Sequence, residues 1–80
     1  MARYWYTICP VCKQGRLFIH VRDDTVELFL RCEECERAWN APDQIHCGTG
    51  AFLAVDIDSH PADVDTLRER GWAGYAQHVA

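Results

Sequence analysis

Five cysteines are the residues of this chain whose types and spacing most clearly indicate chemistry. Four of them form two C-x-x-C pairs, "CPVC" and "CEEC", separated by nineteen residues. Each C-x-x-C turns back on itself and offers two thiolates to one side of a tetrahedron, and this spacing is typical of a four-cysteine zinc site. The sequence therefore predicts one structural Zn²⁺ ion bound by four ligands: Cys9, Cys12, Cys32 and Cys35.

Paired cysteines also occur in disulfide frameworks and in redox proteins. The segment "MARYWYTIC" does not look like a signal peptide, and no stretch approaches the roughly 20 apolar residues that span a membrane. We therefore expect a cytoplasmic protein, in which thiols stay reduced and two disulfides are disfavoured. A thioredoxin-like redox pair is a weaker alternative, because no βαβ pattern surrounds the first pair. Iron remains open as well, since a tetrahedron of four sulfurs admits either metal.

The fifth cysteine, Cys47, follows His46 and lies outside both pairs. The simplest interpretation is a buried small apolar residue, as free cysteines often are. A replacement metal ligand, or a nucleophile with its base, is the alternative. Adjacent side chains usually point apart in an extended chain, however, and no third orienting group is evident. The sequence leaves the roles of Cys47 and His46 open.

The segment between the cysteine pairs, "GRLFIHVRDDTVELFLR", predicts a β-hairpin. Apolar residues alternate with other residues on both sides of a turn at residues 23–25. They are Leu17, Ile19 and Val21 before the turn, and Val26, Leu28 and Leu30 after it. Antiparallel pairing of the two strands would bring the first cysteine pair close to the second. The hairpin is therefore the element expected to position the ligands.

The second half of the chain has other patterns. The segment "NAPDQI" predicts a short helical turn, and the apolar run "AFLAV" predicts a strand beside the hairpin. A helix is expected from Ser59, as its N-cap, to Gly71, which can end the helix in the left-handed conformation. Val64 and Leu67 are spaced so that both would face the hairpin.

Over residues 4–40, about half of the chain, the sequence resembles the zinc ribbon, the rubredoxin-like family of small β-hairpin metal domains. The resemblance lies in "CPVC" with Gly15 three residues on, and in "CEEC" followed by Trp39. Many ribbons have glycine where this chain has Lys13 and Glu36, so we expect less regular turns around the ligands. An iron electron carrier, as in rubredoxin itself, is the alternative that the resemblance implies.

The fold expected from these patterns is a small metal-bound α+β domain. It would contain an antiparallel β-hairpin or three-stranded sheet of the zinc-ribbon type and a C-terminal helix. A chain of 80 residues allows one domain, here residues 1–80, and little more. Within this domain we expect the ribbon at residues 4–40, a connecting turn and possible strand at 41–58, and a helical extension at 59–80.

The charge distribution helps to choose among function classes. The formal net charge is −4, and residues 41–80 carry two basic and six acidic side chains. This balance opposes phosphate binding overall, although a nucleic-acid-binding ribbon remains an alternative. Its cations would be Arg16, Arg22, Arg31 and Arg37. The acidic residues of the second half are either simply solvated or form a surface that attracts a basic partner.

A protein partner would need a contact surface, and the sequence predicts two components for it. One is the acidic group before and within the expected helix. The other is aromatic, because both faces of the hairpin carry apolar side chains and one small helix can cover only one face. The predicted partner-binding residues are Asp56, Asp58, Asp63, Asp65, Phe18, Phe29 and Trp72.

A second, weaker resemblance is to small bacterial zinc-ribbon proteins that serve as immunity or accessory proteins of toxin systems. It lies in "LRCEECERAW", "APDQ" and an acidic helix ending in "RGWAGY". The resemblance implies a protein-interaction module that inhibits a basic toxin by covering its active site. We do not expect an enzyme, because a closed four-thiolate zinc site leaves no open coordination position. We also expect no membrane partner.

Overall fold

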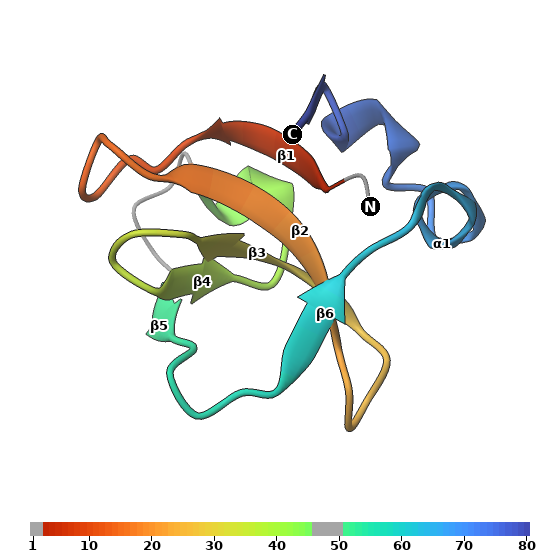
Figure 1. Ribbon diagram of the computed structural model, residues 1–80, viewed down its shortest axis with the longest axis horizontal. Helices are drawn as coiled ribbons and strands as arrows, with labels where there is room; N and C mark the ends of the chain where they lie inside the picture. Colours follow the sequence, from red (N-terminus) through yellow and green to blue (C-terminus); the bar gives the residue numbers. More distant parts are fainter. Residues whose placement is uncertain (1–2, 46–50) are drawn as a thin grey trace.

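One antiparallel sheet organises the chain, and the computed structural model describes residues 3–45 and 51–80 (Figure 1). In the described residues the sheet has seven strands in the order β5-β4-β3-β2-β1-β7, with β6 also paired to β2. The strands are β1 (Tyr4–Ile8), β2 (Arg16–Arg22), β3 (Leu28–Cys32), β4 (Arg37–Trp39), β5 (Phe52–Leu53), β6 (Ser59–Pro61) and β7 (His78–Val79). The helical elements are the 3-10 turns η1 (Pro42–Ile45) and η2 (Ala73–Tyr75) and one short α-helix, α1 (Val64–Glu69). The predicted α+β class is confirmed, and the sheet is larger than the three strands expected.

The predicted hairpin is confirmed as β2 and β3, which pair from Leu17 opposite Cys32 to Val21 opposite Leu28. Its turn is longer than expected. Val26 was predicted to be the first apolar residue of the second strand, but it lies in the turn, with a φ of +54° and a 55% exposed side chain. Its N–H donates to the carbonyl of Arg22 at 2.9 Å, which closes the turn before β3 begins.

Strand β2 is central because both of its edges are paired. One edge pairs with β3, and the other is shared by β1 near the start of β2 and by β6 near its end. His60 in β6 lies opposite Val21, so the backbone from Ser59 to Pro61 continues the sheet. The prediction that a helix begins at Ser59 is therefore wrong. β6 supplies hydrogen-bond partners for the backbone groups on this edge of β2. This pairing outweighs the preference of Ser59 for a helix cap.

The N-cap of the helix lies four residues after the predicted cap. Asp63 is the N-cap, and its Oδ1 accepts a hydrogen bond from the N–H of Thr66 at 2.8 Å. Leu67 faces the core as predicted and is 1% exposed, whereas Val64 is 40% exposed and does not. The helix is also too short to cross a membrane, and none of the helices in the described part of the chain is long and apolar enough to do so.

The end of α1 follows the prediction. Gly71 has a φ of +76° and donates its N–H to the carbonyl of Arg68 at 3.3 Å. The next N–H, that of Trp72, reaches the carbonyl of Leu67 at 2.8 Å, which completes a Schellman motif. Trp72 packs half-buried against the core cluster that contains Leu67, the apolar contact that usually accompanies this motif. The chain then turns through η2 into β7, so residues 59–80 are only partly helical.

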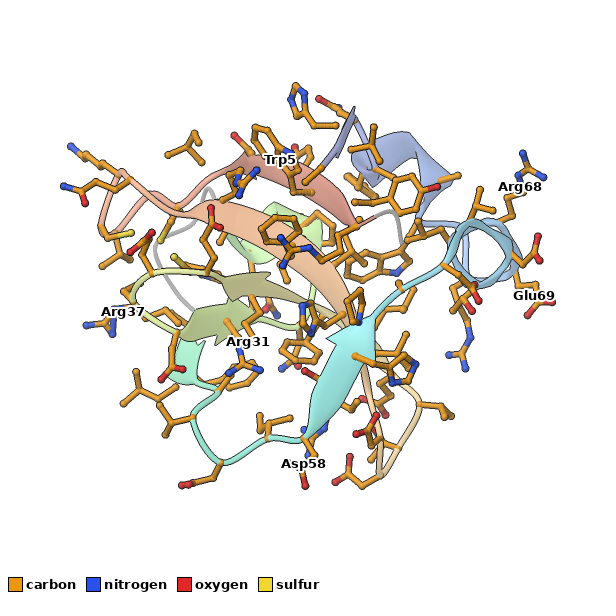
Figure 2. All side chains as sticks on the ribbon, viewed as in Figure 1. Trp5, Arg31, Arg37, Asp58, Arg68 and Glu69 are labelled. Carbon is orange, nitrogen blue, oxygen red and sulfur yellow. The ribbon has the colours of Figure 1, made fainter. Side chains whose placement is uncertain are left out.

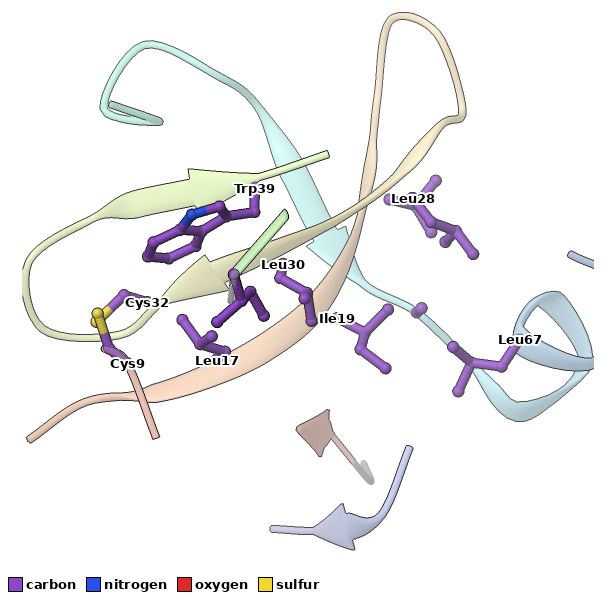
Figure 3. Packing of buried hydrophobic residues seen from close by; sticks show 11 residues of the cluster. Cys9, Leu17, Ile19, Leu28, Leu30, Cys32, Trp39 and Leu67 are labelled. Carbon is purple, nitrogen blue, oxygen red and sulfur yellow. The ribbon is translucent and has the colours of Figure 1, made fainter. Parts of the chain in front are cut away.

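Both faces of the sheet are covered. The larger core lies on the face that receives η1 and α1, and it runs from the cysteines to the helix (Figure 3). Its largest members are Leu17, Ile19, Leu30, Trp39 and Leu67. A smaller cluster lies on the other face and contains Phe29, Ala38 and Ala54, with Phe52 and Ile57 packed against it.

The aromatic residues predicted to form an exposed hairpin face are buried. Phe29 is fully buried because the segment 52–57 folds across it. Phe18 is 2% exposed, and the guanidinium groups of Arg3 and Arg16 lie 4.6 and 5.0 Å from the centre of its ring. Neither side chain can contact a partner in the folded protein, so this part of the predicted surface is wrong. The "AFLAV" segment supplies this cover, and its strand β5 pairs with β4 rather than with the hairpin itself.

Replacing Gly71 by Ala should destabilise the protein by about 1 kcal/mol, because a Cβ at a left-handed residue is strained even where space is free. Gly74→Ala is the matched control, since an added Cβ meets nothing within 4 Å at either position and only Gly71 has a positive φ. Thermal or urea unfolding measures the difference. Equal stability of the two variants would contradict the left-handed C-terminal cap.

Candidate metal centre

The two cysteine pairs lie in turns at one end of the sheet, far from α1 (Figure 1). The first turn connects β1 to β2, and the second connects β3 to β4. Pairing of Leu17 with Cys32 places the second turn beside the first. Within the first turn, the N–H of Cys9 donates to the carbonyl of Gly15 at 2.8 Å, which folds the turn back on itself. The hairpin register therefore brings the four cysteines together, as the sequence predicts.

The geometry of the four sulfur atoms fits a tetrahedral metal ion. All four Sγ atoms lie within 4.8 Å of one another, and Figure 2 shows sulfur atoms gathered between the two turns. The Sγ atoms of Cys9 and Cys35 are 3.8 Å apart, and those of Cys12 and Cys32 are 3.6 Å apart. A zinc–sulfur bond of about 2.3 Å implies tetrahedron edges of about 3.8 Å. A disulfide would need about 2.0 Å between sulfurs, so these cysteines are free thiols, as predicted.

Backbone N–H groups surround the sulfurs. The N–H of Gly15 donates to Cys12 Sγ at 3.4 Å, and the N–H groups of Glu34 and Cys35 donate to Cys32 Sγ at 3.4 and 3.5 Å. Such donors stabilise thiolates and fix their orientation. The thiols of Cys9 and Cys32 are almost completely buried and belong to the same core cluster as Trp39 (Figure 3). The cluster is therefore a continuation of the hydrophobic core.

The environment affects the acidity of the thiols in opposite directions. Hydrogen bonds from the backbone N–H groups of Gln14 and Gly15 lower the pKa of Cys12 to about 6. Burial raises the pKa of Cys9 and raises that of Cys32 to about 12. The buried thiols stay protonated at neutral pH unless a cation replaces their protons. Metal binding at this site must therefore release protons, most of all from these two residues.

The turns around the ligands are regular despite two substitutions. Lys13 and Glu36, where many ribbons have glycine, have φ values of +59° and +61°. Both residues thus adopt the left-handed conformation that glycine adopts at no cost. The two residues therefore keep the backbone conformation of a glycine, at a cost of about 1–2 kcal/mol for each residue.

Position 15 has no room for a side chain, so it requires glycine. A Cβ added at this position would lie 2.5 Å from Cys32 Sγ and 3.0 Å from two carbon atoms of Glu34. The sulfur cannot move away without leaving the tetrahedron. The glycine that follows "CPVC" therefore lets the two turns approach closely enough to share one ion.

The acidic residues predicted to bind a partner fall into two groups. Asp56 and Asp58 are exposed and lie with Asp23 and Asp24 around a surface hollow of about 310 Å³. The N–H of Asp23 donates to the carbonyl of Asp58 at 2.9 Å, which joins the hairpin turn to the segment before β6. Sequence reasoning missed Asp23 and Asp24 because their neighbours come from a remote segment. We name this group the acidic hollow; its residues are Asp23, Asp24, Asp56 and Asp58.

The other predicted contact residues lie elsewhere. Asp63 is occupied as the helix cap, and its hydrogen bonds with the backbone and side chain of Thr66 lower the pKa of its carboxyl group. Asp65 is exposed in the first turn of α1. Trp72 packs against the core and is half-buried. These three residues are therefore not part of the acidic hollow.

The arginines proposed for nucleic-acid binding are mostly paired with acidic residues. Arg16 makes two hydrogen bonds to Glu33, at 2.6 and 3.0 Å. Arg22 pairs with Asp24 at 3.1 Å, and Arg31 lies 3.5 Å from Glu36. No ion pair involves Arg37 in the described part of the chain. Cys47 and His46 lie outside the described residues.

Comparisons with protein-family models, with curated proteins and with solved structures found no match. The cysteine cluster and the small β-rich fold are consistent with a zinc ribbon. The chain thus has a four-cysteine site that could hold a metal ion at one end of a small antiparallel sheet.

Gly15→Ala should weaken metal binding at least about tenfold and destabilise the metal-bound protein by about 1–3 kcal/mol, because the new methyl group displaces a ligand. Competition with a chelator and thermal unfolding measure these effects. Gly74→Ala, which adds a methyl group in open space, is the control and should keep the affinity of the original protein. An unchanged affinity in Gly15→Ala would show that the two turns are farther apart than described.

Proposed function

We propose that this chain is a zinc-stabilised protein-interaction module and not an enzyme. The observation that supports this function is the four-thiolate cluster, which is continuous with the core. Four protein ligands saturate a tetrahedral ion, so no position remains for water or substrate. The ion then acts on the fold, because metal binding and folding are coupled in such sites. Zinc is the metal we propose, since closed four-cysteine sites are typical of structural zinc.

The acidic hollow is the surface that we propose for partner binding. It gathers four aspartates, of which Asp24 pairs with Arg22 and Asp23 lies 2.7 Å from the Nδ1 of His60. No ion pair involves the carboxylates of Asp56 or Asp58 in the described residues. A surface of this kind attracts a basic partner, steers its approach and disfavours acidic competitors. The net charge of −4 acts in the same direction.

The most concrete partner is a basic toxin. The weaker resemblance to small bacterial immunity proteins supports this choice, and so does the charge of the acidic hollow. Such a module would neutralise the toxin by covering its basic active site. The surface that does so must stay rigid, and the metal site and the paired edges of β2 provide that rigidity.

Removing the metal should unfold the protein, because the buried sulfurs lose the ion that holds both turns. The purified protein should contain one zinc per chain by elemental analysis. Adding a strong chelator, or replacing Cys32 by Ser, should abolish the cooperative thermal transition. Red protein with iron–thiolate absorption would show the electron-carrier alternative instead, and a full cooperative transition without metal would refute a structural role.

Reversing two charges in the acidic hollow, Asp56→Lys with Asp58→Lys, should weaken partner binding about tenfold or more, mainly by slowing association. Asp63 is unsuitable for this test, because it caps α1. Glu69→Lys is the control; Glu69 lies on α1, well apart from Asp58 (Figure 2). Both variants and the original protein are used to capture partners from the source cells.

The proposal requires that the captured protein be basic and bind this chain with a one-to-one ratio. The Glu69→Lys variant should still capture it, and the double variant should not. A toxin would also stop growth when produced alone and be harmless when produced together with this chain. Capture of the same protein by all three forms would exclude the acidic hollow as the binding surface.

A further inference from the structure

A second hollow, of about 200 Å³, lies on the sheet face opposite α1. Phe18 and His20 from β2 and Arg31 from β3 contribute to its wall, on the face where they alternate with the core residues of the same strands. Arg3, just before β1, completes it. The rest of the lining is Cys32, Glu33 and Glu36. The hairpin register and the β1–β2 pairing bring these residues together.

A short chain of hydrogen bonds orients the imidazole of His20. Arg31 Nη1 donates to Ser59 Oγ at 3.4 Å, and the same oxygen lies 2.9 Å from His20 Nδ1. Because Ser59 Oγ accepts from Arg31, its own hydrogen is available to His20 Nδ1. Burial, together with the positive charge of Arg31, lowers the pKa of His20 to about 4, so the ring is neutral at pH 7. If Ser59 Oγ donates this hydrogen to Nδ1, the proton of the neutral ring lies on Nε2, for which no hydrogen-bond partner is found among the described residues.

Two arginines line the hollow, Arg3 and Arg31. Arg3 is exposed, has no carboxylate partner in the described residues, and lies over the ring of Phe18 at 4.6 Å. Among the described residues, Arg31 pairs with one carboxylate, that of Glu36, at 3.5 Å. A cation–π contact holds the Arg3 guanidinium without using its N–H donors.

The hollow also has two acidic residues, and each of them is already paired with an arginine. Glu33 is neutralised by Arg16, which binds both of its oxygens, at 2.6 and 3.0 Å. Glu36 pairs with Arg31, at 3.5 Å. Arg16 does not line the hollow itself. Because Arg16 pairs with Glu33, Arg3 is the lining cation that has no carboxylate partner among the described residues.

We propose that this hollow binds a small oxyanion, a carboxylate or a phosphate, through the guanidinium groups of Arg3 and Arg31 and the Nε2–H of His20. Planar guanidinium groups match the oxygens of both anions and form charge-assisted hydrogen bonds with them. The neutral imidazole adds a donor without a further charge. The hollow shares no lining residue with the acidic hollow, so this proposal does not rest on the proposed function.

The test is an NMR titration of the metal-loaded full chain with inorganic phosphate and, separately, with acetate, at constant ionic strength maintained with chloride. We expect saturable shifts of the His20 imidazole and of the Arg3 and Arg31 side-chain N–H signals. Arg3→Gln should weaken binding at least about fivefold, because it removes a charge-assisted contact. Arg68→Gln is the matched control, because Arg68 is exposed on α1, far from Arg31 (Figure 2).

Tighter binding of phosphate would identify a phosphate ligand, and tighter binding of acetate a carboxylate. The proposal fails if chloride gives the same shifts, if the shifts do not saturate, or if they appear at Arg68 and not at His20. Equal affinity of Arg3→Gln and Arg68→Gln would overturn it as well. The titration of the unmodified protein locates the ligand even if a variant does not fold.

Discussion

Four sulfur atoms within 4.8 Å of one another impose the constraint on which the rest of this structure depends. As thiolates they would repel one another in a buried site, and as neutral thiols they would gain little from being gathered. A cation among them removes both difficulties. Since the four cysteines come from the β1–β2 and β3–β4 turns, one bound ion would join four strands of the sheet. A chain of 80 residues has a small core, and this link supplements it.

The parts of the structure that depend on local spacing could be predicted from sequence. The ligands follow from two C-x-x-C pairs, and the hairpin follows from apolar residues with a period of two. Both signals span few residues and need no knowledge of distant partners. The left-handed Gly71 is a third example, because a glycine just after a helix has a specific conformational use.

The parts that depend on remote pairing could not. Ser59 has the local features of a helix cap. In the structure, residues 59–61 instead pair with one edge of β2 and extend the sheet. The sequence predicts an exposed Phe29, but in the structure the segment 52–57 packs across this side chain. The acidic hollow has the same origin, since Asp23 and Asp58 meet through a backbone hydrogen bond between distant segments. Each case depends on a segment that is remote in the sequence, which the alternation of side chains does not reveal.

The left-handed conformations of Lys13 and Glu36 affect how the ion is exchanged. In the metal-bound state the ion holds both turns in this conformation. Once the ion leaves, each residue can relax to an ordinary backbone conformation and recover about 1–2 kcal/mol. If the turns relax in this way without metal, binding of the ion must restore both conformations as well as replace protons. The rate of metal uptake would then depend on these two backbone conformations as well as on the sulfurs.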